Sequence, residues 1–242
     1  MTSTATLERP LDAEALITDM GHRARAAAAV LAQTPTATKA AALKAAARAL
    51  RAAEADILTA NAGDVARGEA NGLSSAMIDR LKLDPKRLEG VAAGLESVAG
   101  LPDPVGQVID ETTRPNGLLL QRVRVPLGVV GIIYESRPNV TADAGALSMM
   151  AGTACILRGG SEAIDTSRAI HACLTAGLRE AGLPEDAIQL VPITDRAANI
   201  QSLVEELLRL IRMIQAHGAA SQLMQSPCLS TSVTISLGCL QD

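Results

Sequence analysis

Aromatic side chains are almost absent from this sequence, which has no phenylalanine, no tryptophan and a single tyrosine, Tyr134. Aromatic residues usually supply large blocks of core surface, so alanine, leucine, valine, isoleucine and methionine must build the core here. The chain has 242 residues, enough to bury a sizeable core as one large domain or two smaller ones. We therefore expect a core of small and aliphatic side chains.

Three further absences exclude classes of protein. No apolar run reaches the length of a membrane span, because charges interrupt every hydrophobic stretch. The 22 basic and 26 acidic residues are mixed along the chain and give a formal net charge of −4, which argues against a general nucleic-acid surface. The first residues lack the basic-then-apolar pattern of a signal peptide. We expect a cytoplasmic protein without membrane or nucleic-acid partners.

The four cysteines, Cys155, Cys173, Cys228 and Cys239, do not show the spacing of a metal site. They are expected to be free thiols in a reducing compartment. Cys155 falls inside a predicted strand and Cys173 inside a predicted helix, where thiols are usually buried and inert. The histidines are scattered over predicted helices, so we predict neither a metal site nor a Cys–His catalytic pair.

The first hundred residues have the pattern of a helical layer. Helices are expected over about residues 12–33 and from Thr36 onward, with Thr36 as N-cap and with Asn61 and Gly63 ending the second helix. Two shorter helices follow, in SSAMIDRLKL and in DPKRLEGVAAGLESVAG, where an Asp-Pro pair supplies the cap and the first turn.

The pattern then changes to strands. The segment GQVIDETTRPNGLLLQRVRVP predicts a β-hairpin over residues 107–126, with its turn at Pro-Asn-Gly. Its three arginines, Arg114, Arg122 and Arg124, make the hairpin locally basic. A solvated strand face explains these charges without a binding role, and we favour that interpretation.

From Leu127 onward, apolar strands alternate with helices. The strands are GVVGIIY, ACILR and AIQLVP, and helices are expected over about residues 138–152, about residues 165–181 and from near Asp195. This alternation predicts a parallel sheet covered on both faces, an α/β, partly doubly wound architecture of the dinucleotide-binding type. Such a fold does not by itself give a function.

The strand ACILR ends in a glycine turn that is a candidate nucleotide site. Gly159 and Gly160 let the backbone approach a ligand, and the following helix start offers N–H groups to an anion. Arg158 can pair with a phosphate, Ser161 opens the helix, and Glu162 can bind a ribose hydroxyl. An ordinary strand-to-helix turn with a carboxylate near its cap explains the same residues, because the motif is not a complete GxGxxG.

The strand GVVGIIY ends in the second candidate segment, YESRPNV. Arg137 could hold a phosphate or carboxylate, and Asn139 could donate its amide to a developing oxyanion, while Pro138 fixes the turn. A turn with a helix-capping asparagine is the alternative.

Several of these segments resemble the gamma-glutamyl phosphate reductase (glutamate-5-semialdehyde dehydrogenase) family of the aldehyde dehydrogenase superfamily. The resemblance rests on YESRPNV, LRGGSEA, GLPEDAIQLVPITDRAA and MIDRLKLDPKRLEGVA, and it extends over about residues 11–198. It favours the functional interpretation of both candidate segments over the structural one.

The resemblance implies an NADPH-dependent reduction of L-glutamyl 5-phosphate to L-glutamate 5-semialdehyde and phosphate, in proline biosynthesis. A thiolate would attack the acyl phosphate, and hydride would reduce the resulting thioester. It implies that Arg158, Gly159, Gly160, Ser161 and Glu162 bind NADPH. Arg137 and Asn139 would bind the substrate, with Asn139 as the oxyanion contact. It also implies a homo-oligomer formed through the hairpin and an association with a glutamate 5-kinase.

The resemblance ends near Asn199. We find neither the family's Pro-Arg-Gly-Gly turn nor its Gly-x-Cys-His segment with the nucleophile, so the catalytic residue is unknown and the catalytic domain is expected to be missing. A truncated product or an interrupted reading frame would explain this, and TSVTISL is expected to form a short strand. The expected division is a helical part of the cofactor domain, the hairpin, a partial Rossmann-like NADPH-binding region and a divergent tail, over residues 1–106, 107–126, 127–198 and 199–242.

Two other functions stay open at this point. A non-catalytic nucleotide-binding or assembly fragment of such an enzyme would account for the missing Cys-His segment. A dehydrogenase for a different acyl substrate is the third hypothesis, because Arg137 alone does not define the acid.

Overall fold

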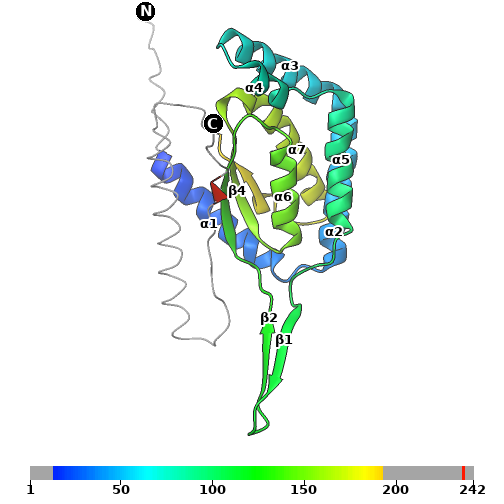
Figure 1. Cartoon of the computed structure of the whole chain (residues 1–242), viewed down its shortest axis with the longest axis vertical. Helices are drawn as coiled ribbons and strands as arrows, with labels where there is room; N and C mark the ends of the chain where they lie inside the picture. The colour runs from blue at the N-terminus through cyan, green and yellow to red at the C-terminus, as the bar shows by residue number, and fades with distance from the viewer. Residues whose placement is uncertain (1–12, 193–235, 238–242) are drawn as a thin grey trace, which may run out of the picture.

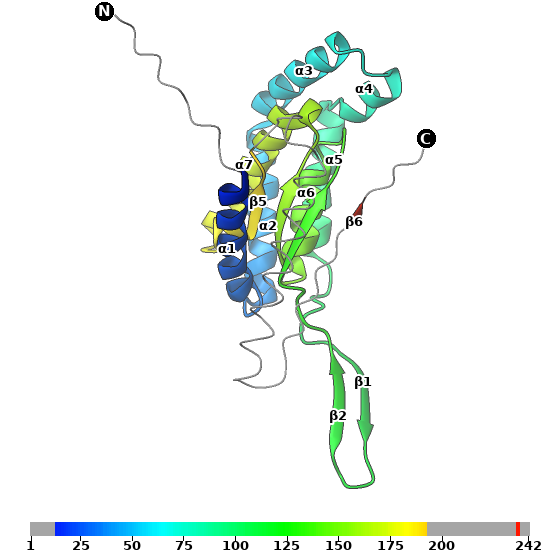
Figure 2. The same cartoon turned by 90° about the vertical axis from the view of Figure 1, so that its left-hand side faces the viewer.

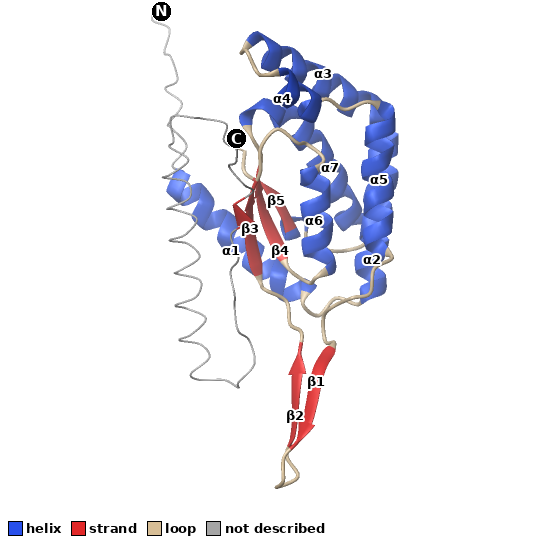
Figure 3. Ribbon diagram, in the orientation of Figure 1, coloured by secondary structure: helices blue, strands red, loops and turns tan. Residues whose placement is uncertain are grey.

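A parallel sheet with helices on both faces forms the centre of the molecule (Figures 1 and 3). The computed structural model describes residues 13–192 and 236–237. The helices of this part are α1 (Ala13–Leu31), α2 (Thr36–Ala52), α3 (Glu54–Ala70), α4 (Ser75–Leu81), α5 (Pro85–Ala99), α6 (Val140–Met150) and α7 (Ile164–Glu180). The strands are β1 (Val108–Thr113), β2 (Leu119–Val123), β3 (Val129–Ile133), β4 (Ala154–Arg158), β5 (Ile188–Leu190) and β6 (Ser236–Leu237).

The sheet has the order β5-β4-β3-β6, and all its neighbouring strands are parallel. Helix α6 connects β3 to β4 and α7 connects β4 to β5, as parallel neighbours require. Helix α1 covers one face of the sheet and α6 and α7 cover the other, with α2 and α5 outside them (Figure 3). The predicted α/β class with a partial doubly wound sheet is confirmed, and β6 lies within the predicted strand TSVTISL.

The hairpin of β1 and β2 projects away from the rest of the described chain (Figure 2). Its strands are antiparallel, and every residue in both is exposed. The predicted Pro-Asn-Gly turn is confirmed, and Gly117 has a φ of +84°, in the left-handed region that favours glycine.

The prediction of one helix from Thr36 to Asn61 is wrong. Helix α2 ends at Ala52, and α3 begins at Glu54 and continues through Asn61 and Gly63. Asn61 does not end the helix, because its side chain is buried and bonded to other elements: Nδ2 donates to the Leu81 carbonyl and Oδ1 accepts the Leu83 N–H.

Thr36 is not the cap of α2. Pro35 occupies the N-cap position, and the Thr36 hydroxyl donates instead to Asp103 at 2.8 Å. The predicted cap of α5 is confirmed, since Asp84 accepts the Arg87 N–H at 2.7 Å and Pro85 is the first helical residue.

A buried lysine joins three parts of the chain at the base of the hairpin. The side chain of Lys39 is 1% exposed, and its Nζ lies 2.5 Å from Asp103 Oδ2 and 3.0 Å from the Met150 carbonyl oxygen. Asp103 also accepts the Val105 N–H, so the segment leading into β1 is fixed to the start of α2 and the end of α6. A buried cation is tolerated only with such partners.

Helices α2 and α7 approach each other closely because small residues face one another. A Cβ at Gly177 would lie 2.5 Å from the Ala42 carbonyl oxygen and 2.6 Å from the Ala46 nitrogen. The predicted core of small and aliphatic side chains is confirmed, and Tyr134 is the one aromatic residue in it.

We expect Gly177→Ala to lower the free energy of unfolding by about 1–3 kcal/mol, because the added methyl would force two helix backbones apart. Gly63→Ala is the matched control, since the nearest atom to its Cβ would be an Arg67 side-chain nitrogen at 3.7 Å. That control should raise stability by up to about 1 kcal/mol through helix propensity. Urea unfolding measures both, and equal midpoints for the two variants would contradict the prediction.

Candidate functional site

The two segments predicted to carry chemistry lie side by side at the carboxyl ends of β3 and β4. The Ser136 N–H and hydroxyl both donate to Glu162 Oε1, each at 2.8 Å. Ser136 precedes Arg137 in the loop after β3, and Glu162 lies in the turn after β4. In open α/β sheets this edge is where ligands bind. The Ser136–Glu162 link therefore makes one site of the two segments.

Ser136 has an unusual backbone conformation that this link stabilises. Its φ is +48°, in the left-handed region, and the residue is 5% exposed. A non-glycine residue in this region costs about 1–2 kcal/mol, and here two hydrogen bonds to a carboxylate offset the cost. The conformation determines how the loop presents Arg137 and Asn139.

The two glycines of the turn make room for protein side chains. A Cβ at Gly160 would collide with the Glu162 carboxylate, and a Cβ at Gly159 would lie 3.2 Å from the Tyr134 ring. Glycine is thus needed at position 160 so that Glu162 can reach Ser136. These contacts with Tyr134 and Glu162 account for both glycines. The approach of a ligand to their backbone stays a prediction.

The first turn of α7 binds a carboxylate of the protein itself. The Thr166 N–H and hydroxyl donate to Asp64 Oδ2 at 2.8 and 2.6 Å, and Asp64 is fully buried. Arg67 pairs with both Asp64 and Asp165. An anion bound there would face these carboxylates.

Sequence reasoning missed this buried polar network, although a signal was present. The buried residues of α3 are Ile57, Asn61, Asp64 and Gly68, a helical repeat that places an amide and a carboxylate on the inward face. Asn61 Nδ2 also lies 3.2 Å from Thr166 Oγ1. Polar residues on a buried face need partners, and here they fix α3 to α7.

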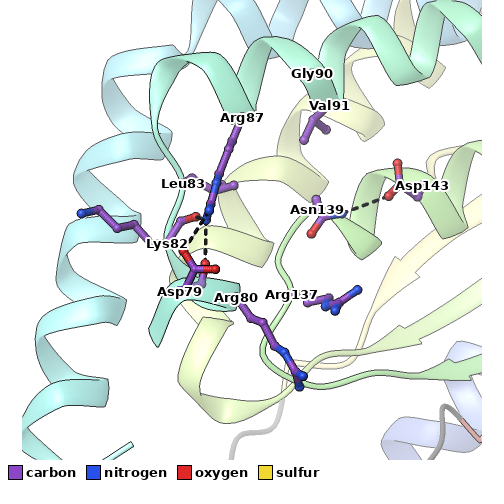
Figure 4. Close-up of a pocket in the computed structure, with 10 residues that line it drawn as sticks. All are labelled: Asp79, Arg80, Lys82, Leu83, Arg87, Gly90, Val91, Arg137, Asn139 and Asp143. Atoms are coloured by element: carbon purple, nitrogen blue, oxygen red, sulfur yellow. Dashed lines mark hydrogen bonds and ion pairs between the residues drawn. The ribbon is translucent and has the colours of Figure 1, made fainter. Parts of the chain in front are cut away.

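An open pocket of about 390 Å³ lies beside the loop after β3 (Figure 4). It brings together Arg137 and Asn139, as predicted, with residues from α4, α5 and α6 that sequence reasoning did not select. Its lining residues are Asp79, Arg80, Lys82, Leu83, Arg87, Gly90, Val91, Arg137, Asn139 and Asp143.

Of the four cationic side chains in this pocket, those of Arg80, Lys82 and Arg137 have no hydrogen-bond or ion-pair partner in the described part of the chain. The Arg87 guanidinium donates to Asp79 Oδ1 at 2.9 Å and to the Asp79 and Lys82 carbonyls. The guanidinium groups of Arg80 and Arg137, by contrast, form no hydrogen bond or ion pair with any described residue. Both are therefore available to an anion.

Asn139 does not cap α6 with its side chain, so the capping alternative is wrong. It occupies the N-cap position, but its Oδ1 accepts no backbone N–H of the helix, and its Nδ2 donates to Asp143 Oδ2 at 3.1 Å. Partial burial raises the pKa of the Asp143 carboxyl, and the hydrogen bond from Asn139 opposes that rise. The amide of Asn139 thus lies at the pocket wall, beside a carboxylate.

Arg158 and Ser161 lie outside this pocket, on the β4 side of the link. Arg158 ends β4 and is partly exposed, and it forms no ion pair with a described residue. Ser161 begins a short 3-10 turn over Ser161–Ala163 and is also partly exposed. The candidate site therefore has two halves, the glycine turn and the pocket.

The described thiols are unsuited to nucleophilic chemistry. Cys155 and Cys173 are buried, and burial raises their pKa values to about 12 and about 11. Cys228 and Cys239 lie outside the described residues. In the described part no group of histidine, cysteine and acidic side chains is arranged to hold a metal, and no helix has the length and apolar character of a membrane span.

We expect Cys155 and Cys173 to resist iodoacetamide in the folded chain at pH 8, because only the thiolate reacts and burial disfavours it. In urea both should be alkylated, which makes the unfolded chain the control. Peptide mapping by mass spectrometry distinguishes the two states. Fast alkylation of either thiol in the folded chain would contradict its burial.

Comparison with known proteins gives a consistent result. No protein-family model matches the chain. A gamma-glutamyl phosphate reductase of Rhizorhabdus wittichii is 74% identical over 202 residues, which cover 82% of this chain and 47% of that protein. The crystal structure of the Thermotoga maritima gamma-glutamyl phosphate reductase superposes with a TM-score of 0.72 at 38% identity, covering 76% of this chain and 44% of its own.

An acetylating aldehyde dehydrogenase of Geobacillus thermoglucosidasius shares the fold alone, with a TM-score of 0.55 at 13% identity over 82% of this chain and 40% of its own. The chain spans about half the length of the curated relatives it matches. In sequence and in fold, this chain is thus similar to a little under half of a gamma-glutamyl phosphate reductase.

Proposed function

We propose that this chain carries the cofactor-binding part of an oxidoreductase of proline biosynthesis. The reaction is the reduction of L-glutamyl 5-phosphate by NADPH to L-glutamate 5-semialdehyde, with release of phosphate. The observation that supports it most is the Ser136–Glu162 link, because it holds a cationic pocket against a glycine turn at the ligand-binding edge of the sheet. A cytoplasmic location is part of the same proposal.

The glycine turn suits the adenosine end of NADPH. Glu162 uses Oε1 twice for Ser136, and its Oε2 has no hydrogen bond from a described residue and can accept one from a ribose hydroxyl. Arg158, which is partly exposed and unpaired among the described residues, can bind the 2′-phosphate. Ser161 adds a hydroxyl beside them. When bound, the nicotinamide supplies the hydride.

The loop after β3 suits the reacting end of the substrate. Arg137 can neutralise the phosphate, which leaves more readily when its charge is balanced. Asn139 can donate its amide to the carbonyl oxygen as negative charge develops there. The Asn139–Asp143 hydrogen bond orients that amide before the substrate arrives.

The thiol that would attack the acyl phosphate does not come from the described part of the chain. Both described cysteines are buried with raised pKa values, which leaves no thiolate near the pocket. We therefore propose that turnover by this chain alone is impaired. The division into a helical cofactor part, residues 1–106, a hairpin, residues 107–126, an NADPH-binding region, residues 127–198, and a divergent tail, residues 199–242, remains a proposal.

A non-catalytic nucleotide-binding or assembly fragment is the second candidate function. The lack of a reactive thiol in the described part favours it. Phosphate-dependent reduction of NADP⁺ by the purified chain, with glutamate semialdehyde supplied as pyrroline-5-carboxylate, separates the two candidates. Turnover supports the enzyme, and NADPH binding without turnover supports the fragment.

We expect Arg158→Gln to weaken NADPH binding about tenfold, because a charge-assisted bond to the 2′-phosphate would be lost. Lys44→Gln removes the same charge from the exposed surface of α2 and should leave the affinity unchanged. Fluorescence titration of each variant with NADPH measures the effect. Equal affinities for the wild-type chain and Arg158→Gln would contradict the assignment.

We also propose that the hairpin joins copies of this chain. Its apolar side chains are exposed, among them Ile109 at 53% and Leu119 at 51%, and an isolated two-stranded hairpin is only marginally stable in water. A second copy would cover these side chains. An association with a glutamate 5-kinase stays a prediction.

The double substitution Ile109→Gln with Leu119→Gln should convert the oligomer to a monomer, because it removes apolar surface from the hairpin. Leu147→Gln is the control, since Leu147 is 52% exposed on α6 and outside the hairpin. Sedimentation velocity measures the assembly. A wild-type chain that sediments as a monomer would contradict the proposal.

A further inference from the structure

We propose that Arg80 determines which acyl phosphates this site accepts, by binding a second anionic group at the end of the substrate remote from the phosphate. The inference deepens the proposed function and rests on it. The substrate class is small acyl phosphates that also carry a carboxylate. Arg80 and Arg137 then bind the two anionic ends of one ligand.

The two arginines come from different parts of the fold and meet at one pocket. Arg80 belongs to α4 and Arg137 to the loop after β3, and both line the same space. Figure 4 shows both side chains extending to one side of the pocket, while Arg87 extends toward Asp79. Because Arg80 and Arg137 have no described protein partner, an anion need not displace one to reach either of them.

The charges around the pocket favour a ligand with more than one negative charge. Four cationic and two acidic side chains line it. Asp79 is paired with Arg87, and Lys82 extends away from Arg137 in Figure 4. Asp143 is therefore the one carboxylate left to balance Arg80 and Arg137 within the described lining. Two guanidinium groups with one carboxylate attract a dianion and disfavour a neutral aldehyde.

The position of each arginine decides which end of the ligand it binds. Arg137 is two residues from Asn139, the amide proposed to donate to the reacting carbonyl oxygen, so the reacting carbon must lie on this side. Arg80 reaches the pocket from α4, an element separate from the loop that carries Arg137 and Asn139. Binding energy from a remote, non-reacting group can hold the reacting group in position.

The test compares two ligands that differ by one carboxylate. The first is the phosphonate analogue of glutamyl 5-phosphate in which a methylene replaces the bridging oxygen, and the second is the same compound without its α-carboxylate. Calorimetry with the full chain should show that Arg80→Gln weakens binding of the first about tenfold and leaves the second unchanged. Arg137→Gln should weaken binding of both.

Lys86→Gln is the matched control, because Lys86 is an exposed cation of α5 and does not line the pocket. It should leave the affinities for both phosphonates unchanged. Arg80→Lys, which keeps the positive charge, should restore part of the preference for the phosphonate that carries the α-carboxylate. Equal effects of Arg80→Gln on both ligands, no effect on either, or no binding of either ligand to the wild-type chain would each overturn the inference. NADPH titration of the same samples tests the proposed cofactor turn independently, so the two failures are distinguishable.

Discussion

The buried carboxylate of Asp64 is the interaction on which the arrangement of the site depends. It accepts two hydrogen bonds from Thr166 at the start of α7 and pairs with Arg67. An unpaired buried carboxylate would be strongly destabilising, so these partners must stay in place. Because α7 follows the glycine turn directly, this contact determines where the turn lies against α3. Asn61 extends the network to Leu81 and Leu83 at the pocket.

A second contact, between Ser136 and Glu162, joins the glycine turn to the loop beside the pocket. Glu162 accepts both hydrogen bonds from Ser136 on Oε1, and its Oε2 is the atom proposed to bind the ribose. Glu162 therefore stabilises the loop that carries Arg137 and is also a residue of the proposed cofactor turn. A displacement of Glu162 in the proposed cofactor half would therefore move Ser136 and the loop of the proposed substrate half.

Local patterns predicted most of the fold, and long-range contacts account for most of what they missed. Apolar, β-branched segments between helices were sufficient to predict the parallel sheet. An Asp-Pro pair was sufficient to predict where α5 begins. Asn61 looked like a helix end because its partners lie about twenty residues away. Arg80 could not be selected, since only the folded chain brings α4 and the loop after β3 to the same pocket. The sequence singled out Gly160 as part of a turn. Only the folded structure shows that glycine is needed there because Glu162 occupies the space of a Cβ.

The buried Lys39 has a mechanical consequence for any assembly made through the hairpin. Its ammonium group connects Asp103, just before β1, with the Met150 carbonyl at the end of α6. The first turns of that same helix carry Asn139 and Asp143. The hairpin therefore has a rigid attachment, through one side chain and one helix, to the pocket wall. If copies of the chain associate through the hairpin as proposed, strain at that interface would reach α6 and the groups proposed to hold the acyl phosphate.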